Sequence, residues 1–370
     1  MRNLLRQILM KFSRDWLLLA LLALFPFLLW LAPAGSGALP GLVDWTTVSA
    51  LAGLMVLSRG LEVSDMIDRV GRAVLMRLHS IRWLAVTLVL MAAILSAIVT
   101  NDVALFVTVP LTLGLARMVA LPVGRLVIFQ ALAVNAGSAL STVGNPQNLL
   151  LWQVSGMGFV EFTLTMLPIS GVMLALVLAL VPVGFGKAPL ALADMKSPLP
   201  LKRDLMGASL IAYPLFLWAV NAGFALAGAA VIIAVFSIRF RDILRGVDWT
   251  LLLVFILMFV NMVLAGQIPM IETQVSALLH GPGSAFALGA GLSQVISNVP
   301  AAIFLAAFTD EWRALAWGVN VGGFGLAFGS LANLIALRLY RQPGLWVQFH
   351  LWSLPVFGIS FAAGAVLLAI

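Results

Sequence analysis

The chain has 370 residues, of which 62% are hydrophobic and 9% charged, and its formal net charge is +7. A soluble domain of this length needs far more charged surface, so the composition predicts a polytopic membrane protein. The basic excess does not indicate nucleic-acid binding, because Lys and Arg lie in short loops, where they set membrane topology. The sequence has no cysteine for disulfides or thiolate metal sites, and His79, His280 and His350 are too far apart to predict a metal cluster.

The N-terminal part is predicted to hold two membrane spans. Residues 17–31 form an apolar run behind a basic head, and we expect an uncleaved first span with a cytoplasmic N-terminus, not a signal peptide. A second span starts at Thr46 and leads to the basic segment 62–82. That segment is amphipathic and is expected to lie along the inner membrane surface.

Two interrupted apolar stretches follow. Residues 83–118 are broken at Thr100-Asn101-Asp102, which predicts a helical hairpin. Residues 126–152 are apolar at both ends, but Asn, Gly, Ser and Pro fill the middle. Such a segment cannot continue as a lipid-facing helix, so we predict a broken helix that lines a cavity. Residues 159–186 are expected to cross back to the inner side.

The second half repeats this order. Residues 187–204, rich in Pro and Lys, predict a cytoplasmic linker between a first half, 1–186, and a second half, 205–370. The second half is predicted to hold spans near 205–220, 224–238 and 249–266, a second hairpin at 284–308, a second broken helix at 314–339 and a last span at 345–370. In this topology Arg313 is the one basic residue of 21 that lies outside, as the positive-inside rule requires.

The two halves match at their breaks. Residues 96–103 (SAIVTNDV) align with 293–300 (SQVISNVP), and 135–149 (NAGSALSTVGNPQNL) align with 320–334 (NVGGFGLAFGSLANL) without a gap. The first hairpin is expected to have its ends inside and the second its ends outside. The predicted fold is therefore an all-α polytopic membrane protein with two inverted-topology repeats, each with a re-entrant helical hairpin and a broken transmembrane helix.

The second hairpin supports re-entry, because its arms of about 13 and 10 residues span only about 20 and 15 Å of a ~30 Å hydrocarbon core. By the repeat, the first tip should also lie at depth. Asp102 is the only acidic residue deep within a long apolar segment, and a carboxylate there is expected to be functional. An exposed turn at Asp102, and simple helix packing for Ser96, Ser293 and the glycines, remain the alternatives.

At these residues the chain resembles the ion transporter superfamily, which includes arsenite permeases, sodium/proton antiporters, citrate permeases and divalent anion:sodium symporters. Asn101-Asp102 resembles the Ala-Asn-Asp hairpin tip of arsenite permeases, and 297–300 and 329–332 are similar to the same branch. Length and motifs most resemble the YbiR-type inner-membrane permeases. The resemblance implies a multi-pass protein of the bacterial inner membrane.

The resemblance also implies two kinds of site. In the anion:sodium branch, tip and break residues of each half enclose one sodium ion. Carried over, the ion-binding residues are Ser96, Asn101, Gly144, Ser293, Asn298 and Gly329. The tip hydroxyls of Thr100 and Ser297 are further candidate ion ligands, since hydroxyl oxygens suit a hard cation. The implied substrate contacts are Asn101, Asp102, Asn145, Pro146, Asn298, Val299, Ser330 and Leu331. The chain departs from that branch at Asp102 and Val299, where the branch has Thr. Both changes disfavour a dicarboxylate and favour proton coupling or a small neutral or monovalent oxyanion.

The sequence therefore predicts a secondary active transporter of a small anion or oxyanion, of arsenite or carboxylate type, coupled to H⁺ or Na⁺ by alternating access. The alternative is a sodium/proton antiporter in which Asp102 is the exchanging carboxylate and proton carrier. An enzyme is disfavoured, since no Ser/His/Asp set, metal-ligand spacing or phosphate loop is evident. Expected partners are the small anion and the lipid bilayer, with a homodimer left open, and no cofactor is expected beyond the coupling ion.

Overall fold

The computed structural model describes residues 16–31, 39–66, 69, 78, 80–116, 120–189, 200–281 and 283–370. The predicted N-terminal orientation, most of the amphipathic segment 62–82 and most of the linker 187–204 fall outside these residues. The described chain is helical apart from its connections and one isolated bridge between Ser80 and Pro189.

The first half runs in the predicted order. Its helices are α2 (Trp16–Leu31), α3 (Trp45–Val63), α5 (Ile81–Ile98), α6 (Asn101–Ala116), α7 (Val123–Ser138), α8 (Pro146–Ser155) and α9 (Phe159–Gly184). Short polar side chains start several of them: Asp44 accepts from the backbone N–H groups of Thr46 and Thr47, and Ser80 accepts from Trp83 N.

The second half contains α10 (Arg203–Asn221), α11 (Ala225–Arg239), α12 (Arg241–Gly246), α13 (Trp249–Gly266), α14 (Pro269–Leu278), α15 (Ser284–Ile296), α16 (Asn298–Leu305), α17 (Trp312–Val321), η2 (Ala327–Gly329), α18 (Leu331–Leu339) and α19 (Leu345–Ala369). Two short helices were not predicted. α12 follows α11 directly, and α14 lies between the predicted span 249–266 and the predicted hairpin 284–308. The linker also ends earlier than predicted, because α10 begins at Arg203.

Five helices of the described chain are at least 18 residues long and apolar enough to cross a membrane. The arms of the second hairpin are shorter: α15 has 13 residues and α16 has 8. At 1.5 Å per residue these arms reach about 20 and 12 Å, less than the ~30 Å core. The inversion of the two halves relative to the membrane stays a prediction.

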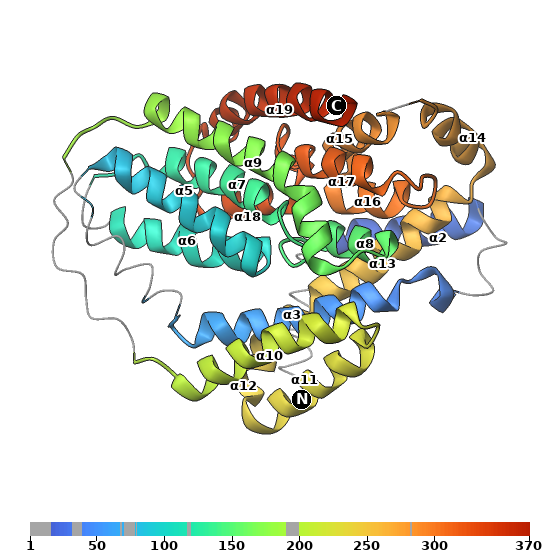
Figure 1. Cartoon of the computed structure of the whole chain (residues 1–370), viewed down its shortest axis with the longest axis horizontal. Helices are drawn as coiled ribbons and strands as arrows, with labels where there is room; N and C mark the ends of the chain where they lie inside the picture. Colours follow the sequence, from blue (N-terminus) through green and yellow to red (C-terminus); the bar gives the residue numbers. More distant parts are fainter. Residues whose placement is uncertain are drawn as a thin grey trace.

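The helices pack as two groups (Figure 1). The central group contains both hairpins and both broken helices, α5–α9 and α15–α19. The flanking group contains α2, α3 and α10–α13, in which α3 packs against α10 and α11 while α2 packs against α13. The groups meet where α3 contacts α6 and α8 and where α13 contacts α16. This junction positions the candidate site.

Candidate functional site

The first break separates α7 from α8 and is held by asparagine side chains. Asn145 caps α8 by accepting from Asn148 N at 2.9 Å. The Asn148 amide donates to the carbonyls of Ser138, Ala139 and Ser141 at 3.3, 2.9 and 3.1 Å. These are carbonyl groups that an interrupted helix leaves without intrahelical partners. The buried Asn148 side chain therefore supplies hydrogen bonds to the last carbonyl groups of α7, which solvent does not reach.

The second break uses the corresponding residues. Ser330 caps α18 and accepts from Ala332 N at 3.3 Å, and the Asn333 amide donates to Gly323 O at 2.9 Å. Asn333 aligns with Asn148 and Ser330 with Asn145 in the sequence repeat. The same device therefore closes both breaks.

Four buried asparagines join the two breaks, and we call them the asparagine network: Asn135, Asn148, Asn320 and Asn333. Asn135 Nδ2 donates to Asn333 Oδ1 at 2.7 Å, and Asn320 Nδ2 donates to Asn148 Oδ1 at 2.6 Å. Asn135 aligns with Asn320, and Asn148 aligns with Asn333. Each bond thus links one half to the other. The two bonds are equivalent, because each joins a residue of one half to the residue of the other half that corresponds to its counterpart's partner.

The first hairpin tip is fastened to the break of its own half. Asn101 N donates to Gly144 O at 2.9 Å, and Ser141 Oγ donates to Ala97 O at 2.6 Å. A Cβ on Gly137 would lie 2.1 Å from Ala93 O, so only glycine permits this close approach of α7 to α5. The break and the tip therefore form one rigid unit.

The second tip is fastened through a side chain instead. Gln294, which aligns with Ala97, donates to Gly322 O at 2.7 Å and accepts from Leu326 N at 2.7 Å. Its turn is also tighter, since Ser297 alone joins α15 to α16 with φ 74° and ψ 155°. A positive φ at a residue other than glycine stores backbone strain and is typical of functional positions.

Both tips bury a hydroxyl without a hydrogen-bond partner. Thr100 Oγ1 and Ser297 Oγ occupy aligned positions, and neither has a regular partner among the described residues. The Thr100 hydroxyl does interact with the neighbouring Asp102 carboxyl group. Buried polar atoms are nearly always satisfied in proteins, so two such hydroxyls at aligned positions distinguish the tips from the rest of the hairpins.

Tips and breaks enclose one small cavity of about 40 Å³. It is lined by Leu51, Met55, Thr100, Asn101, Asp102, Pro146, Leu251, Phe255, Asn298, Val299, Ser330, Leu331, Ala332 and Ile335. Seven of the eight predicted substrate contacts are therefore brought together. The eighth, Asn145, is buried beside the cavity, where its amide donates to Asn320 Oδ1 at 2.9 Å.

The predicted ion-binding residues divide into two sets. Thr100, Asn101 and Asn298 line the cavity, whereas Ser96, Gly144, Ser293, Ser297 and Gly329 do not line it. Ser96 Oγ donates to Ala93 O at 2.9 Å and Ser293 Oγ to Gly289 O at 2.6 Å, inside their own helices. The structure is therefore compatible with ion ligation or with helix packing for these two serines, and their role stays a prediction.

Four helix N-termini point at this cavity. Residues at the starts of α6, α8, α16 and α18 line it. Its polar side chains are Thr100, Asn101, Asp102, Asn298 and Ser330, whereas α8 contributes only Pro146. Each N-terminus carries a partial positive charge of about half a unit. Side chains already accept from N–H groups at the starts of α6, α8 and α18, so the helix dipole is the main contribution of these ends to the cavity. Among the described residues that line the cavity, Asp102 is the only ionisable side chain. The cavity therefore joins a set of positive helix ends to a single carboxylate.

The sequence did not reveal the opposite wall of the cavity. Leu51 and Met55 of α3 and Leu251 and Phe255 of α13 form it, all from the flanking group. Their residue types are ordinary for a membrane span, so no local pattern distinguishes them. A weak signal existed in α3, whose small and hydroxyl-bearing residues give a helix that is buried over most of its length.

Comparison with known proteins agrees with this architecture. The inner membrane protein YbiR of Escherichia coli is 44% identical over 333 residues, which cover 90% of this chain and 89% of that protein. An uncharacterised transporter of Methanocaldococcus jannaschii is 32% identical over 303 residues, covering 80% of this chain and 82% of that protein.

A solved structure shows the same fold. The crystal structure of the YdaH transporter of Alcanivorax borkumensis, described as having an unusual topology, superposes with a TM-score of 0.57 at 17% identity, over 95% of this chain and 96% of that one. The citrate transporter family matches residues 7–317. Together with the relationship to YbiR, this match places the chain in the citrate transporter family of the ion transporter superfamily, as a multi-pass membrane transporter.

Proposed function

We propose that the chain is a secondary active transporter of a small anion or oxyanion, coupled to H⁺ or Na⁺, with the central cavity as its substrate site. The observation that carries this proposal is the convergence of four helix N-termini on a cavity with one carboxylate. Helix N-termini bind anions without any basic side chain. The hydroxyl and amide groups of Thr100, Asn101, Asn298 and Ser330 add further hydrogen-bond donors.

Asp102 supplies the coupling in this proposal. Two like charges about 4 Å apart repel by about 4 kcal/mol at an effective dielectric constant of 20, which corresponds to about 10³-fold in affinity. An anion therefore binds well only when the Asp102 carboxylate is neutralised by a proton or balanced by a cation. By linkage, the anion promotes protonation of Asp102 to the same degree. Simultaneous binding of both species is the requirement for symport.

Sodium is the second candidate coupling ion. Hydroxyl, amide and backbone carbonyl oxygens suit a hard cation, and the unpartnered hydroxyls of Thr100 and Ser297 provide two such oxygens at aligned positions. Asn101 and Asn298 stand beside them at the two tips. These residues fit the paired sodium sites that the family resemblance implies.

The size of the cavity favours a small substrate. Larger organic ligands occupy pockets of about 300–1,000 Å³. A cavity of about 40 Å³ lined by Val299 and Asp102 suits an inorganic oxyanion or a one-carbon to two-carbon carboxylate better than citrate.

Alternating access is proposed to occur at the junction of the two helix groups. The polar lining belongs wholly to the central group, and the facing wall from α3 and α13 is apolar. Phe159 N donates to Asn221 Oδ1 at 3.3 Å across the two groups. An apolar contact with few hydrogen bonds lets the central group move against the flanking group at low energetic cost.

A sodium/proton antiporter remains the second candidate function. It is favoured by the lack of any Lys or Arg among the described residues that line the cavity, since Asp102 could then exchange Na⁺ for H⁺. Uptake into proteoliposomes under separate pH and sodium gradients distinguishes the two, with a panel of oxyanions and short carboxylates. Accumulation of one anion under either gradient supports the symporter. Exchange of Na⁺ for H⁺ without accumulation of any anion supports the antiporter.

We also propose that the N-terminus is cytoplasmic. In that topology Thr273 of α14 lies outside and Arg245 of α12 lies inside. The chain has no native cysteine, so single cysteines at these positions can be labelled selectively in intact cells. Labelling of Thr273→Cys but not Arg245→Cys by an impermeant reagent is expected, and the reverse pattern would exclude this orientation.

A further inference from the structure

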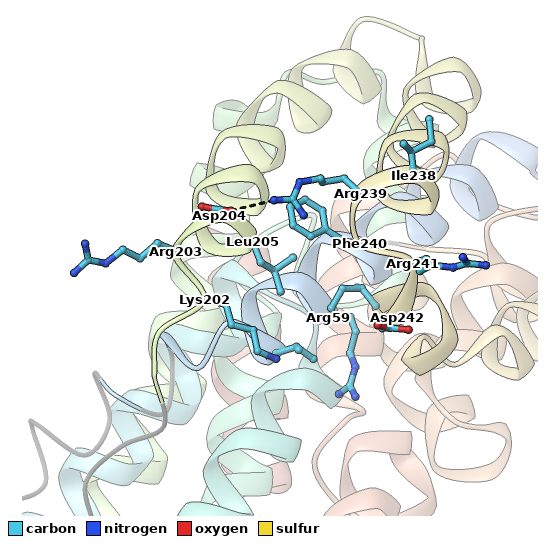
Figure 2. Close-up of a pocket in the computed structure, with 12 residues that line it drawn as sticks. Arg59, Lys202, Arg203, Asp204, Leu205, Ile238, Arg239, Phe240, Arg241 and Asp242 are labelled. Carbon is cyan, nitrogen blue, oxygen red and sulfur yellow. Dashed lines mark hydrogen bonds and ion pairs between the residues drawn. The ribbon is translucent and has the colours of Figure 1, made fainter.

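A second cavity lies in the flanking group, at the C-terminal end of α3, about one helical turn beyond the α3 residues that line the central cavity. It has a volume of about 590 Å³ and is formed by the end of α3, the start of α10, the end of α11 and the start of α12. Its lining residues are Arg59, Val63, Lys202, Arg203, Asp204, Leu205, Ile238, Arg239, Phe240, Arg241, Asp242 and Ile243. Figure 2 shows that Arg203 and Arg241 point outward at its rim.

Positive charge in this cavity exceeds negative charge. Five of the lining side chains are basic and two are acidic. Both acidic side chains are already engaged: Asp204 pairs with Arg239 at 3.1 Å, and Asp242 pairs with Arg245 at 2.9 Å. Lys202, Arg203 and Arg241 have no ion pair among the residues that the structure describes. Among the described residues, the cavity therefore has Lys202 in its lining and Arg203 and Arg241 at its rim, none of them paired with a carboxylate.

Arg59 adds an unsatisfied buried donor. Its Nη1 pairs with Glu62 at 2.7 Å, but its Nε is buried without a hydrogen-bond partner among the described residues. The guanidinium packs against Gly246, where an added Cβ would lie 2.8 Å from Nε. A planar guanidinium with a free N–H is well suited to a phosphate oxygen.

An apolar track leads away from the cations. Val231, Val235 and Ile238 of α11 are exposed, and their spacing of four and three residues places them on one helix face. Ile238, at 87% exposure, also lines the cavity. A soluble inorganic anion makes no apolar contact with these side chains. An amphiphile can place its charged headgroup among the basic residues and its acyl chain along α11.

We propose that this cavity binds the phosphate headgroup of an anionic phospholipid, with an acyl chain along the exposed face of α11. Basic pockets between membrane helices are suited to such headgroups. The bound lipid joins α3, α10, α11 and α12 and so anchors the flanking group in the bilayer. The site is independent of the substrate of the central cavity, since none of their lining residues is shared.

The test is lipid binding to the purified full chain, measured by native mass spectrometry after titration with dioleoylphosphatidylglycerol. Lys202→Gln/Arg241→Gln is compared with Arg338→Gln/Arg341→Gln, which removes two positive charges outside the cavity. The cavity variant is expected to bind about tenfold more weakly and the control within about twofold of wild type. Lys202→Arg/Arg241→Lys keeps the charges and is expected to retain binding.

Further measurements distinguish binding of a phospholipid from binding of free phosphate. Dioleoylphosphatidylcholine is expected to bind at least about tenfold more weakly, because its headgroup has no net charge. Inorganic phosphate at equal concentration should not displace the phosphatidylglycerol, and Ile238→Ser should weaken binding by shortening the apolar track. Equal binding of both lipids, displacement by phosphate, or equal binding by the cavity and control variants would overturn the proposal. If the double variant does not fold, Lys202→Gln and Arg241→Gln are tested singly against Arg338→Gln.

Discussion

The first hairpin tip, between α5 and α6, and the second tip, between α15 and α16, lie at corresponding places beside the asparagine network. Each tip has a serine bonded to its own helix, a hydroxyl without a partner and an asparagine at the cavity. They differ at the next position, where the first has Asp102 and the second has Val299. The same scaffold therefore holds a carboxylate on one side of the cavity and a methyl surface on the other.

The tips also differ in how they are held. The first uses a backbone bond from Asn101 N to Gly144 O, whereas the second depends on the Gln294 side chain and places Ser297 at a positive φ. The repeated framework thus supplies shape and helix dipoles to both halves. Of the two tips, only the first can bind and release a proton in the cavity, because Asp102 has a carboxyl group and Val299 does not.

The largest expected effect is at the position where the tips differ. Asp102→Asn keeps the shape of the protonated side chain but cannot release a proton. With proton coupling, a gradient of one pH unit supports about tenfold accumulation, and the variant should reduce this ratio to about one while retaining substrate exchange. Val299→Thr, at the aligned position, adds no titratable group, so the accumulation ratio should persist even where the affinity for the substrate changes. Accumulation and counterflow are measured side by side in proteoliposomes, and unchanged accumulation in Asp102→Asn would exclude Asp102 as the proton carrier.

Asn101→Ala and Asn298→Ala test whether the tips are equivalent as ligands. A hydrogen bond to a charged group contributes about 1.5–3 kcal/mol, so each variant should lower initial transport rates by about tenfold to hundredfold. Inserted protein of normal amount, measured by gel filtration, is the control for folding. Near-normal transport in one variant would show that the asparagine of that half is not a ligand of the transported species.

Glycine substitutions compare how closely each broken helix approaches its hairpin. In Gly137→Ala the new Cβ meets the backbone Ala93 O at 2.1 Å, and in Gly322→Ala it meets Ser293 Cβ at 2.5 Å. Backbone cannot move aside as a side chain can, so Gly137→Ala should cost more, about 3 kcal/mol or above, against about 1–3 kcal/mol. Gly171→Ala, with open space around its Cβ position, is the control. Thermal unfolding in detergent measures all three, and equal midpoints would contradict the close approach.

The last comparison lies within the asparagine network. Asn320→Ala removes the donor to Asn148 Oδ1 and the acceptor for Asn145 Nδ2, whereas Asn135→Ala removes the donor to Asn333 Oδ1. Each variant also loses one bond to a carbonyl of its own helix. Leaving buried polar groups unpaired costs about 1–3 kcal/mol each, so Asn320→Ala should lower the unfolding midpoint more than Asn135→Ala. The reverse order would show that the bonds across the two halves do not carry the stability.

Several features of the candidate site were determined by the sequence alone. Asn145-Pro146 predicts a helix start in any context, because the asparagine caps the helix and the proline lacks the N–H that a first turn leaves free. The matched spacing of 135–149 and 320–334 placed the breaks in both halves within a few residues of their observed positions. These are local effects of backbone chemistry and hydropathy, so they do not depend on which helices become neighbours.

Only the tertiary structure decided which partners meet. That Asn135 bonds to Asn333 of the other half, that Gln294 fastens the second tip, and that Leu51 and Phe255 face Asp102 depend on contacts between residues far apart in sequence. The basic cavity follows the same rule, since Arg59, Lys202 and Arg241 come from three separate segments. The physical reason is that hydropathy fixes where a helix lies in the membrane, whereas side-chain packing and the pairing of buried polar groups fix which faces touch.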